Sequence, residues 1–319
     1  MGRSGLLGDR SFNLYRESGV EPRQGDIGPW RKLLGHIFGE APRECAWFEQ
    51  WVAYALRYPG TKLFTAVVLW GVQGAGKSLL GETIGKLYGE NYYELSQADL
   101  KGQFNEWLRF RQFILVNEIV STGSQKDADE LKAMITREYA TINRKYQPHF
   151  SVRDCVNYFI TSNHPNALRI EGSERRFFVY RVSRVIDTDL ANAIGRQAAL
   201  LHHLLREVDI EGFDPRAPAP ETAAKLDMVE AGISDLDRFI LDAIDAARHG
   251  EGPGLVTAEK LKQQFEDGSR TNRTSLKAVT RALQKYGVVN LGQMRISGER
   301  GRYWQLRETE KRPVMGEGM

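Results

Sequence analysis

The feature that most constrains the fold of this chain is the octapeptide GVQGAGKS at residues 71–78, which matches G-x-x-x-x-G-K-[ST] in full. An apolar run, Leu63 to Trp70, precedes it, and a helical pattern, Ser78 to Tyr88, follows it. Glycines in such a strand–loop–helix unit let successive backbone N–H groups face a phosphate. The sequence therefore predicts an α/β nucleotide-binding core, with a ligand-free glycine-rich turn as the alternative. The expected ligand contacts are Gly71, Val72, Gln73, Gly74, Ala75, Gly76, Lys77, Ser78 and Leu79.

Polar residues of the loop and at the end of the next apolar strand fit the hydrolysis of ATP with Mg²⁺. Lys77 is expected to neutralise the β- and γ-phosphates, and the Ser78 hydroxyl to hold Mg²⁺. The strand Phe113–Val116 runs directly into Asn117 and Glu118. We expect Glu118 to activate water and, with Asn117, to orient the water shell of Mg²⁺. An exposed strand end without a catalytic role is the alternative interpretation.

Further polar residues follow the next apolar strand. Asn163 ends the segment FITSN, where an amide can contact both the γ-phosphate and the attacking water, although a plain turn residue is the alternative. Arg175 and Arg176 lie in ERRFFVY. A guanidinium supplied by a neighbouring subunit would stabilise transition-state charge. The sequence does not distinguish between the two arginines, and a surface arginine pair remains possible.

Composition excludes several classes of protein. Hydrophobic residues make up 41% and charged residues 27%, which is typical of a globular chain. The longest apolar stretch, Leu63–Trp70, is far shorter than the ~20 residues of a membrane helix. The N-terminal MGRSGLLGDR lacks the apolar core of a signal peptide, so we expect a cytoplasmic protein of a bacterial or phage-infected host cell, without a membrane partner. Cys45 and Cys155 are too few for a disulfide framework.

Basic residues are concentrated in two segments. The net charge of the chain is +3, but residues 137–184 carry nine basic and four acidic side chains, and residues 271–319 carry ten and four. The rest of the chain is therefore acidic. This distribution is typical of a protein that binds a polyanion.

Hydrophobic periodicity and turn residues divide the chain into segments. Helices are expected at 30–58, 78–88, 97–108, 127–139 and 190–208, and strands at 63–70, 112–119, 156–161 and 176–182, with a hairpin whose tip lies near 146–149. The predicted organisation is a flexible arm at 1–28, a helical segment at 29–60, a core at 61–211, a proline-containing linker at 212–233, a C-terminal module at 234–308 and a tail at 309–319.

The C-terminal module has the pattern of a winged helix. Three helical segments, at 236–247, 258–265 and 274–286, precede two short strands at 288–291 and 302–306. The basic residues of the third segment are spaced four apart, as on one helix face: Arg273, Lys277, Arg281 and Lys285. Such a stripe fits a helix lying against duplex or origin DNA. A solvated basic face, with the module used for packing or partner binding, is the alternative.

Taken together, the ordered motifs GVQGAGKS, FILVNE, INRKYQP, FITSN and ERRFFVY resemble superfamily 3 helicases of the AAA+ class. The resemblance is greatest to the helicase half of phage and plasmid primase-helicase proteins of the poxvirus type, and it covers roughly residues 11–230. It implies an AAA+ P-loop core, a hexameric ring and a hairpin that grips single-stranded DNA in the central channel. Lys145 matches the basic residue of that hairpin, between Arg144 and Tyr146. Independently, a lysine beside an aromatic suits phosphate contact and base stacking, and a solvated hairpin is the alternative.

Two departures from that family bear on function. Asn117 stands where the family has an acidic residue, and no primase or polymerase module precedes the motifs, so a separate primase or polymerase is an expected partner. The leading hypothesis is an ATP-driven DNA helicase or translocase in replication of a phage, plasmid or mobile element. The alternatives are an AAA+ DNA-binding initiator or switch that uses ATP for assembly, and a P-loop kinase for a small metabolite.

Overall fold

The computed structural model describes residues 5–6, 12–13, 16, 19–96, 99, 104–119, 125–171, 173–193, 195, 197–268, 271 and 273–306. The chain divides into two compact units, residues 1–232 and 233–319. Within the expected arm at 1–28, residues 1–4, 7–11, 14, 15, 17 and 18 lie outside the described residues, as does all of the expected tail at 309–319. Within the described ranges, no helix is long and apolar enough to cross a membrane.

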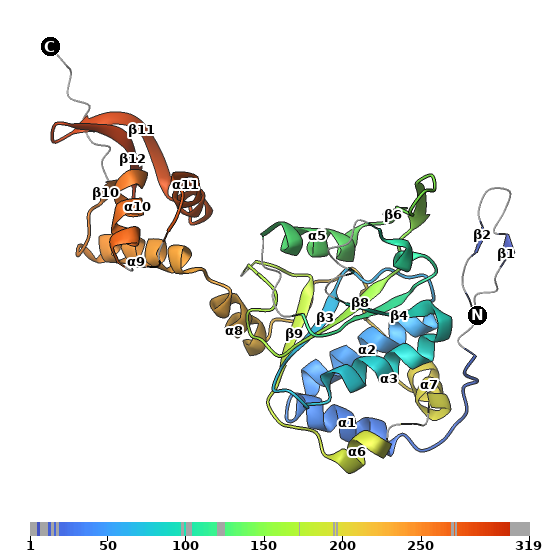
Figure 1. The fold of residues 1–319 in the computed structure, drawn as a ribbon. Coiled ribbons are helices and arrows are strands. Elements are labelled where there is room, and N and C mark those ends of the chain that lie inside the picture. The colour runs from blue at the N-terminus through green and yellow to red at the C-terminus, as the bar shows by residue number, and fades with distance from the viewer. Residues whose placement is uncertain are drawn as a thin grey trace. The chain divides into compact units, whose positions relative to one another are not determined.

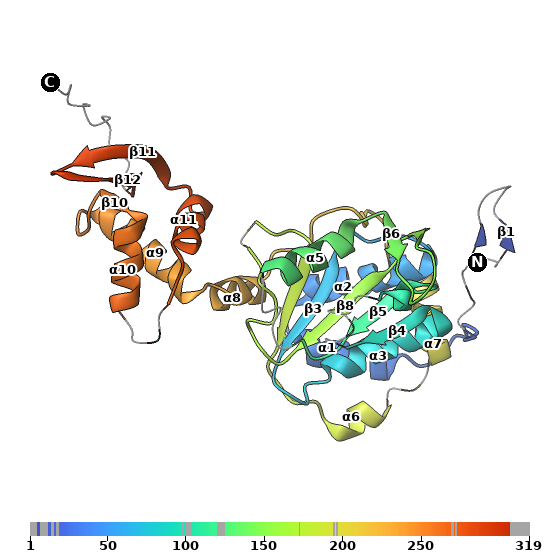
Figure 2. The same cartoon turned by 45° about the horizontal axis from the view of Figure 1, so that its top comes forward.

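A parallel sheet forms the centre of the first unit. Within the described residues it has five strands in the order β4-β5-β8-β3-β9, and every neighbouring pair is parallel (Figure 2). The four core strands predicted from apolar runs are confirmed, whereas the half-exposed edge strand β4 was not expected. Because the strands all run the same way, their carboxyl ends meet at one edge. The strands are β3 (Ala66–Gly71), β4 (Tyr92–Leu95), β5 (Phe113–Val116), β8 (Asn157–Ser162) and β9 (Phe177–Val182).

Helices cover both faces of this sheet (Figure 1). One face packs against α1 (Gly28–Phe38), α2 (Pro42–Arg57), α3 (Lys77–Tyr88) and α7 (Gln197–Arg206). The other face packs against α5 (Gln125–Thr136) and α8 (Ala223–Ala231). The first unit is thus a mixed α/β domain in which a parallel sheet lies between helices. Its remaining short elements are β1 (Gly5–Leu6), β2 (Phe12–Asn13), η1 (Gly89–Asn91), η2 (Glu106–Leu108) and α6 (Thr188–Ala193).

Three predicted helices are interrupted or shorter than expected. The pattern over 30–58 forms two helices, because Gly39 takes a left-handed conformation (φ 54°) after α1 and Pro42 opens α2. The pattern over 190–208 likewise forms α6 and α7. Of the helix expected at 97–108, residues 97, 98 and 100–103 lie outside the described residues, and residues 106–108 form the 3₁₀ turn η2.

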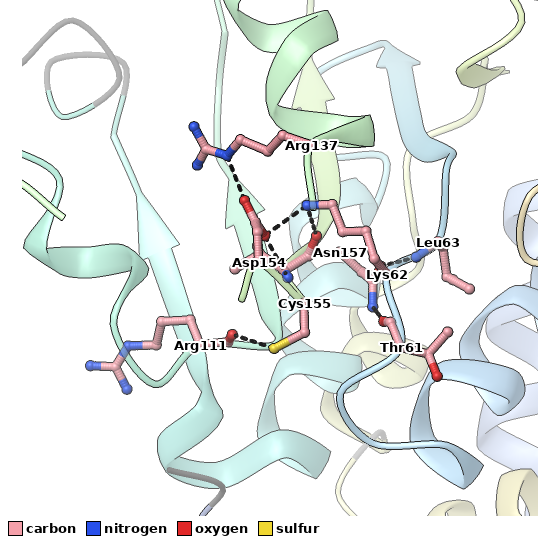
Figure 3. Close-up of polar contacts among 9 residues, drawn as sticks. Thr61, Lys62, Leu63, Arg111, Arg137, Asp154, Cys155 and Asn157 are labelled. Atoms are coloured by element: carbon pink, nitrogen blue, oxygen red, sulfur yellow. Dashed lines mark hydrogen bonds and ion pairs between the residues drawn. The ribbon is translucent and has the colours of Figure 1, made fainter. Parts of the chain in front are cut away.

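The expected hairpin is present as β6 (Tyr139–Ile142) paired antiparallel with β7 (Phe150–Arg153). The hairpin is held from two sides. At the carboxyl end of β6, Asn105 Nδ2 donates to the carbonyl of Thr141, and Asn105 Oδ1 accepts from the N–H of Asn143. On the other side, the buried Asp154 carboxylate accepts from Lys62 Nζ (2.8 Å) and Arg137 Nε (2.6 Å) (Figure 3). These contacts tie the hairpin to the amino edge of the sheet.

The segment predicted as a linker at 212–233 instead packs against the first unit as far as residue 232. Phe64 N–H donates to the carbonyl of Pro215, and the buried Thr222 hydroxyl donates to the carbonyl of Val179. Met228 of α8 is fully buried in the core. The prolines therefore lie in an extended segment that packs on the domain. The segment is not a solvated linker, because its apolar residues are buried against the first unit.

The second unit contains helices followed by a β-hairpin, as its sequence pattern predicts. Its described part has a three-stranded antiparallel sheet in the order β10-β12-β11, in which β10 is an additional strand. The predicted basic stripe needs one correction. Ser275 caps α11 by accepting from the N–H of Ala278, so Arg273 precedes the helix and does not lie on it. The elements are α9 (Asp235–His249), β10 (Leu255–Thr257), α10 (Ala258–Asp267), α11 (Leu276–Lys285), β11 (Val289–Ile296) and β12 (Glu299–Gln305).

Candidate functional site

The glycine-rich loop 71–78 joins the carboxyl end of β3 to α3. Gly71, Gly74 and Gly76 have φ of 139°, 73° and 83°, a region that favours glycine. A Cβ on Gly71 would lie 1.9 Å from the carbonyl oxygen of Val182, so a side chain is excluded there. Among the described residues, no side chain caps the start of α3. The first N–H groups of this helix are therefore suited to an anion.

Lys77 links the loop to the neighbouring strand. Its Nζ donates to the carbonyls of Gly71 (3.1 Å) and Val72 (2.7 Å) and to Oδ1 of Asn163 (2.9 Å). Burial lowers the pKa of Lys77, and the nearby Glu118 carboxylate partly offsets this effect. Three residues predicted from separate motifs thus lie together at the carboxyl edge of the sheet.

Asn117 is the centre of a hydrogen-bond network beside the loop. Its Oδ1 accepts from Ser78 Oγ (2.7 Å) and from Thr161 Oγ1 (2.8 Å), and its Nδ2 donates to Glu94 Oε1 (2.9 Å). Sequence reasoning identified Ser78 and Asn117 but not Thr161 or Glu94. Thr161 precedes Asn163 by two positions, a spacing that places both on one face of a strand. Glu94 has no such signal, because it lies on the edge strand β4.

Glu118 follows Asn117 in an unusual backbone conformation. Its φ of 54° is left-handed, which is uncommon for a residue other than glycine and is found at functional sites. Its N–H donates to Thr161 Oγ1 (3.2 Å), and its side chain is exposed. The strained turn thus places the exposed carboxylate beyond the end of the strand, where it is close enough to Lys77 to raise the pKa of that lysine.

The oxygen atoms at this edge suit Mg²⁺ bound together with a nucleotide. Within the part of the chain that the structure describes, no group of three His, Cys, Asp or Glu side chains could hold a metal by itself. Mg²⁺ is commonly held by one or two protein oxygens together with substrate phosphates and water. The Ser78 hydroxyl, the Asn117 amide and the Glu118 carboxylate fit such a partial ligand set.

The arginine pair lies away from this edge. Since Phe177 begins β9 beside Ala66 at the start of β3, Arg175 and Arg176 lie at the amino edge of the sheet, opposite the loop of their own chain. Arg176 is ion-paired with the buried Glu174 (3.0 Å), whereas the Arg175 side chain is exposed. The pair therefore does not join the residues around Lys77 within one chain.

The hairpin tip presents a basic and an aromatic side chain to solvent. Tyr146 is 92% exposed, and Lys145 Nζ lies 5.0 Å from the centre of its ring. Arg144 instead points back to the domain and pairs with Glu106 (2.9 Å). Of the three residues expected to contact DNA here, two are therefore exposed at the tip.

The basic face of the second unit is narrower than predicted. Lys277 and Arg281 are exposed on α11. Lys285, one helical turn further on, is also exposed but pairs with Asp237 of α9 (3.2 Å). The charge of the last lysine of the predicted stripe is therefore partly neutralised within the unit.

The described fold is that of an α/β domain, and the site at the carboxyl edge of its parallel sheet is consistent with a nucleotide-binding-like core. Residues 69–176 match a family of unknown function, DUF5906. The chain is 30% identical over 161 residues to the DNA primase-polymerase of Nitratiruptor phage NrS-1. That match covers 49% of this chain and 22% of the relative, so the chain spans about a fifth of the relative's length.

Solved structures extend the likeness to nearly the whole chain. The apo structure of the NrS-1 C-terminal region is similar with a TM-score of 0.69 and 22% identity, covering 94% of this chain and 81% of that chain. The A form of the same apo region gives a TM-score of 0.66 and 21% identity, covering 92% and 79%. These two likenesses support the fold.

Proposed function

We propose that this chain is an ATP-driven DNA helicase or translocase of the superfamily 3, AAA+ type, acting in replication of a phage or related mobile element. The observation that carries the proposal is the meeting of Lys77, Ser78, Asn117, Glu118 and Asn163 around one glycine-rich loop. Similarity to a phage DNA primase-polymerase supports a role in phage replication.

In this proposal the loop N–H groups and Lys77 bind the phosphates of ATP, and Ser78 and Asn117 hold Mg²⁺ or its water shell. When bound, Mg²⁺ would neutralise charge on the phosphate oxygens. Glu118, freed from the strand by its left-handed backbone, accepts a proton from the attacking water. Lys77 Nζ donates to Asn163 as well as to the loop carbonyls. When the phosphates bind this lysine, the hydrogen bond to Asn163 would change, which fits a sensor of the bound nucleotide.

The arginines at the opposite edge fit a site shared between subunits. Since Arg175 and Arg176 are remote from their own loop, either acts only on the loop of a neighbouring subunit. Arg175 is the better candidate, because Arg176 is held by Glu174. This arrangement requires a ring or other oligomer, for which we propose a hexamer, and it couples hydrolysis to the neighbour.

DNA contacts are assigned to two surfaces. The exposed tip residues Lys145 and Tyr146 would grip single-stranded DNA by phosphate contact and stacking. The second unit, which we interpret as a winged helix, would bind duplex DNA through Lys277 and Arg281 on α11, with Arg273 just before that helix. A separate primase or polymerase remains a proposed partner.

The decisive experiment measures ATPase rate with and without single-stranded DNA, together with oligomer mass, for wild type, Lys145→Ala and the control Lys32→Ala. Lys32 is an exposed lysine of α1. We expect DNA to stimulate hydrolysis in wild type and in the control but not in Lys145→Ala, with nucleotide binding unchanged in all three. An ATPase rate that changes neither with DNA nor with the Lys145→Ala substitution would contradict translocation and favour the ATP-controlled DNA-binding switch.

A further inference from the structure

The network around Asn117 contains an acidic residue that the proposed ATP site does not use. Glu94 lies on the edge strand β4, beside Leu115 of β5, and its Oε1 accepts from Asn117 Nδ2 at 2.9 Å. Because Glu94 is exposed, its carboxylate could be hydrated by solvent and does not need Asn117 as a hydrogen-bond partner. It lies next to the position at which the chain carries an amide rather than a carboxylate.

Glu94 determines which way the Asn117 amide faces. A carboxylate only accepts hydrogen bonds, so the amide nitrogen must point to Glu94 and the amide oxygen to the loop. In that orientation Oδ1 is the acceptor shared by the hydroxyls of Ser78 and Thr161. If the amide were reversed, its NH₂ would face both hydroxyls and its oxygen would face a negative charge.

The orientation extends to the hydroxyl of Ser78. Because Ser78 Oγ donates its proton to Asn117 Oδ1 at 2.7 Å, its lone pairs are left for a cation. Thr161 uses its proton in the same way and accepts from the N–H of Glu118 at 3.2 Å. A chain of four residues thus joins Glu94 to the turn that carries Glu118.

We propose that Glu94 is a positioning residue for Mg²⁺: it orients the Asn117 amide, and through it the Ser78 hydroxyl, towards the metal that accompanies ATP. The proposal rests on the proposed ATP site and adds a residue to it. Outer hydrogen-bond partners of this kind change metal affinity by roughly 10- to 100-fold when removed.

The test is a Mg²⁺ titration of the binding of a fluorescent ATP analogue, followed by anisotropy, which needs no turnover. The variants are Glu94→Ala, Glu94→Gln, Asn117→Leu and the double Glu94→Ala/Asn117→Leu, with Lys77→Ala as the variant that removes the loop lysine. Glu211→Ala is the control, since Glu211 is exposed and lies in the segment that leads to the amino edge. Binding in EDTA measures the part of the affinity that does not depend on the metal.

We expect Glu94→Ala to raise the Mg²⁺ concentration for half-maximal binding by about 10- to 100-fold, with binding in EDTA unchanged. Glu94→Gln keeps an acceptor for Asn117 Nδ2 and should stay within about threefold of wild type. Since Glu94 acts through Asn117, the double variant should be no worse than Asn117→Leu alone.

Three other outcomes would overturn the proposal, and they are distinguishable. A Glu94→Ala protein with the wild-type Mg²⁺ midpoint refutes the role of Glu94 while leaving the ATP site intact. Equal losses in Glu94→Gln and Glu94→Ala refute the orienting role, because glutamine keeps the acceptor. No Mg²⁺-dependent binding in wild type, matched by Lys77→Ala, refutes the ATP site itself.

Discussion

The buried carboxylate of Asp154 offers the sharpest test of how the hairpin is held. Its side chain is 1% exposed and accepts from Lys62 Nζ (2.8 Å), Arg137 Nε (2.6 Å) and the N–H of Val156 (3.0 Å) (Figure 3). The Lys62 side chain is itself only 8% exposed. Asp154→Asn keeps the shape of the side chain and removes the charge that both cations require.

The magnitude follows from the number of partners left without a counter-charge. Whichever way the new amide turns, its NH₂ faces either Lys62 or Arg137, so a donor meets a donor. Removing one partner of a buried ion pair typically costs about 3–5 kcal/mol, and we expect a loss of that order. The exposed pair Arg216–Glu138, at 4.0 Å, is the control, and Arg216→Gln should cost less than about 1 kcal/mol.

Urea unfolding followed by tryptophan fluorescence measures this loss, because five of the six tryptophans lie in the first unit. The pH dependence is a second readout. Burial lowers the pKa of Lys62 below its ordinary 10.5, and Asp154 opposes this effect. In Asp154→Asn the lysine pKa falls further, so the unfolded state binds more protons and stability rises with pH. The deficit should therefore shrink as pH approaches 10.5, and a loss no larger than that of Arg216→Gln at pH 7 would refute the reasoning.

Three further predictions concern the loop, the second unit and a partly buried thiol. Gly71→Ala should abolish nucleotide binding, because its Cβ would lie 1.9 Å from a backbone oxygen. Gly74→Ala, whose Cβ would have its nearest neighbour at 3.5 Å, should lower the free energy of unfolding by only about 1–2 kcal/mol, the cost of an alanine in a left-handed conformation. Equal effects of the two substitutions would contradict this reasoning. The double variant Lys277→Ala/Arg281→Ala should make the plot of log affinity for duplex DNA against log salt concentration less steep, by about 2 in the slope. An unchanged slope would exclude phosphate contacts by these two side chains. Burial raises the pKa of Cys155 to about 11, so alkylation at pH 8 should be about 100-fold slower than for a thiol of pKa 9 until urea is added; rapid labelling of the folded protein would show an accessible thiolate.

The sequence by itself determined the parts of this protein that are contiguous in the chain. The strand–loop–helix unit around Gly71–Ser78 is identifiable because glycine spacing and flanking apolar runs are local properties. The same holds for Asn117 and Glu118 after β5 and for the hairpin at 139–153. Since parallel strands place their carboxyl ends together, Asn163 could also be assigned to the site before its neighbours were known.

The tertiary structure alone decided what depends on the order of the strands. Glu94 meets Asn117 because β4 pairs with β5, and nothing in the short segment Tyr92–Leu95 announces that pairing. The packing of residues 212–232 and the ion pairs of Asp154 likewise join segments far apart in the chain. Periodicity reports which face of an element is apolar, whereas the partner of a polar side chain is fixed only when the strands are brought together.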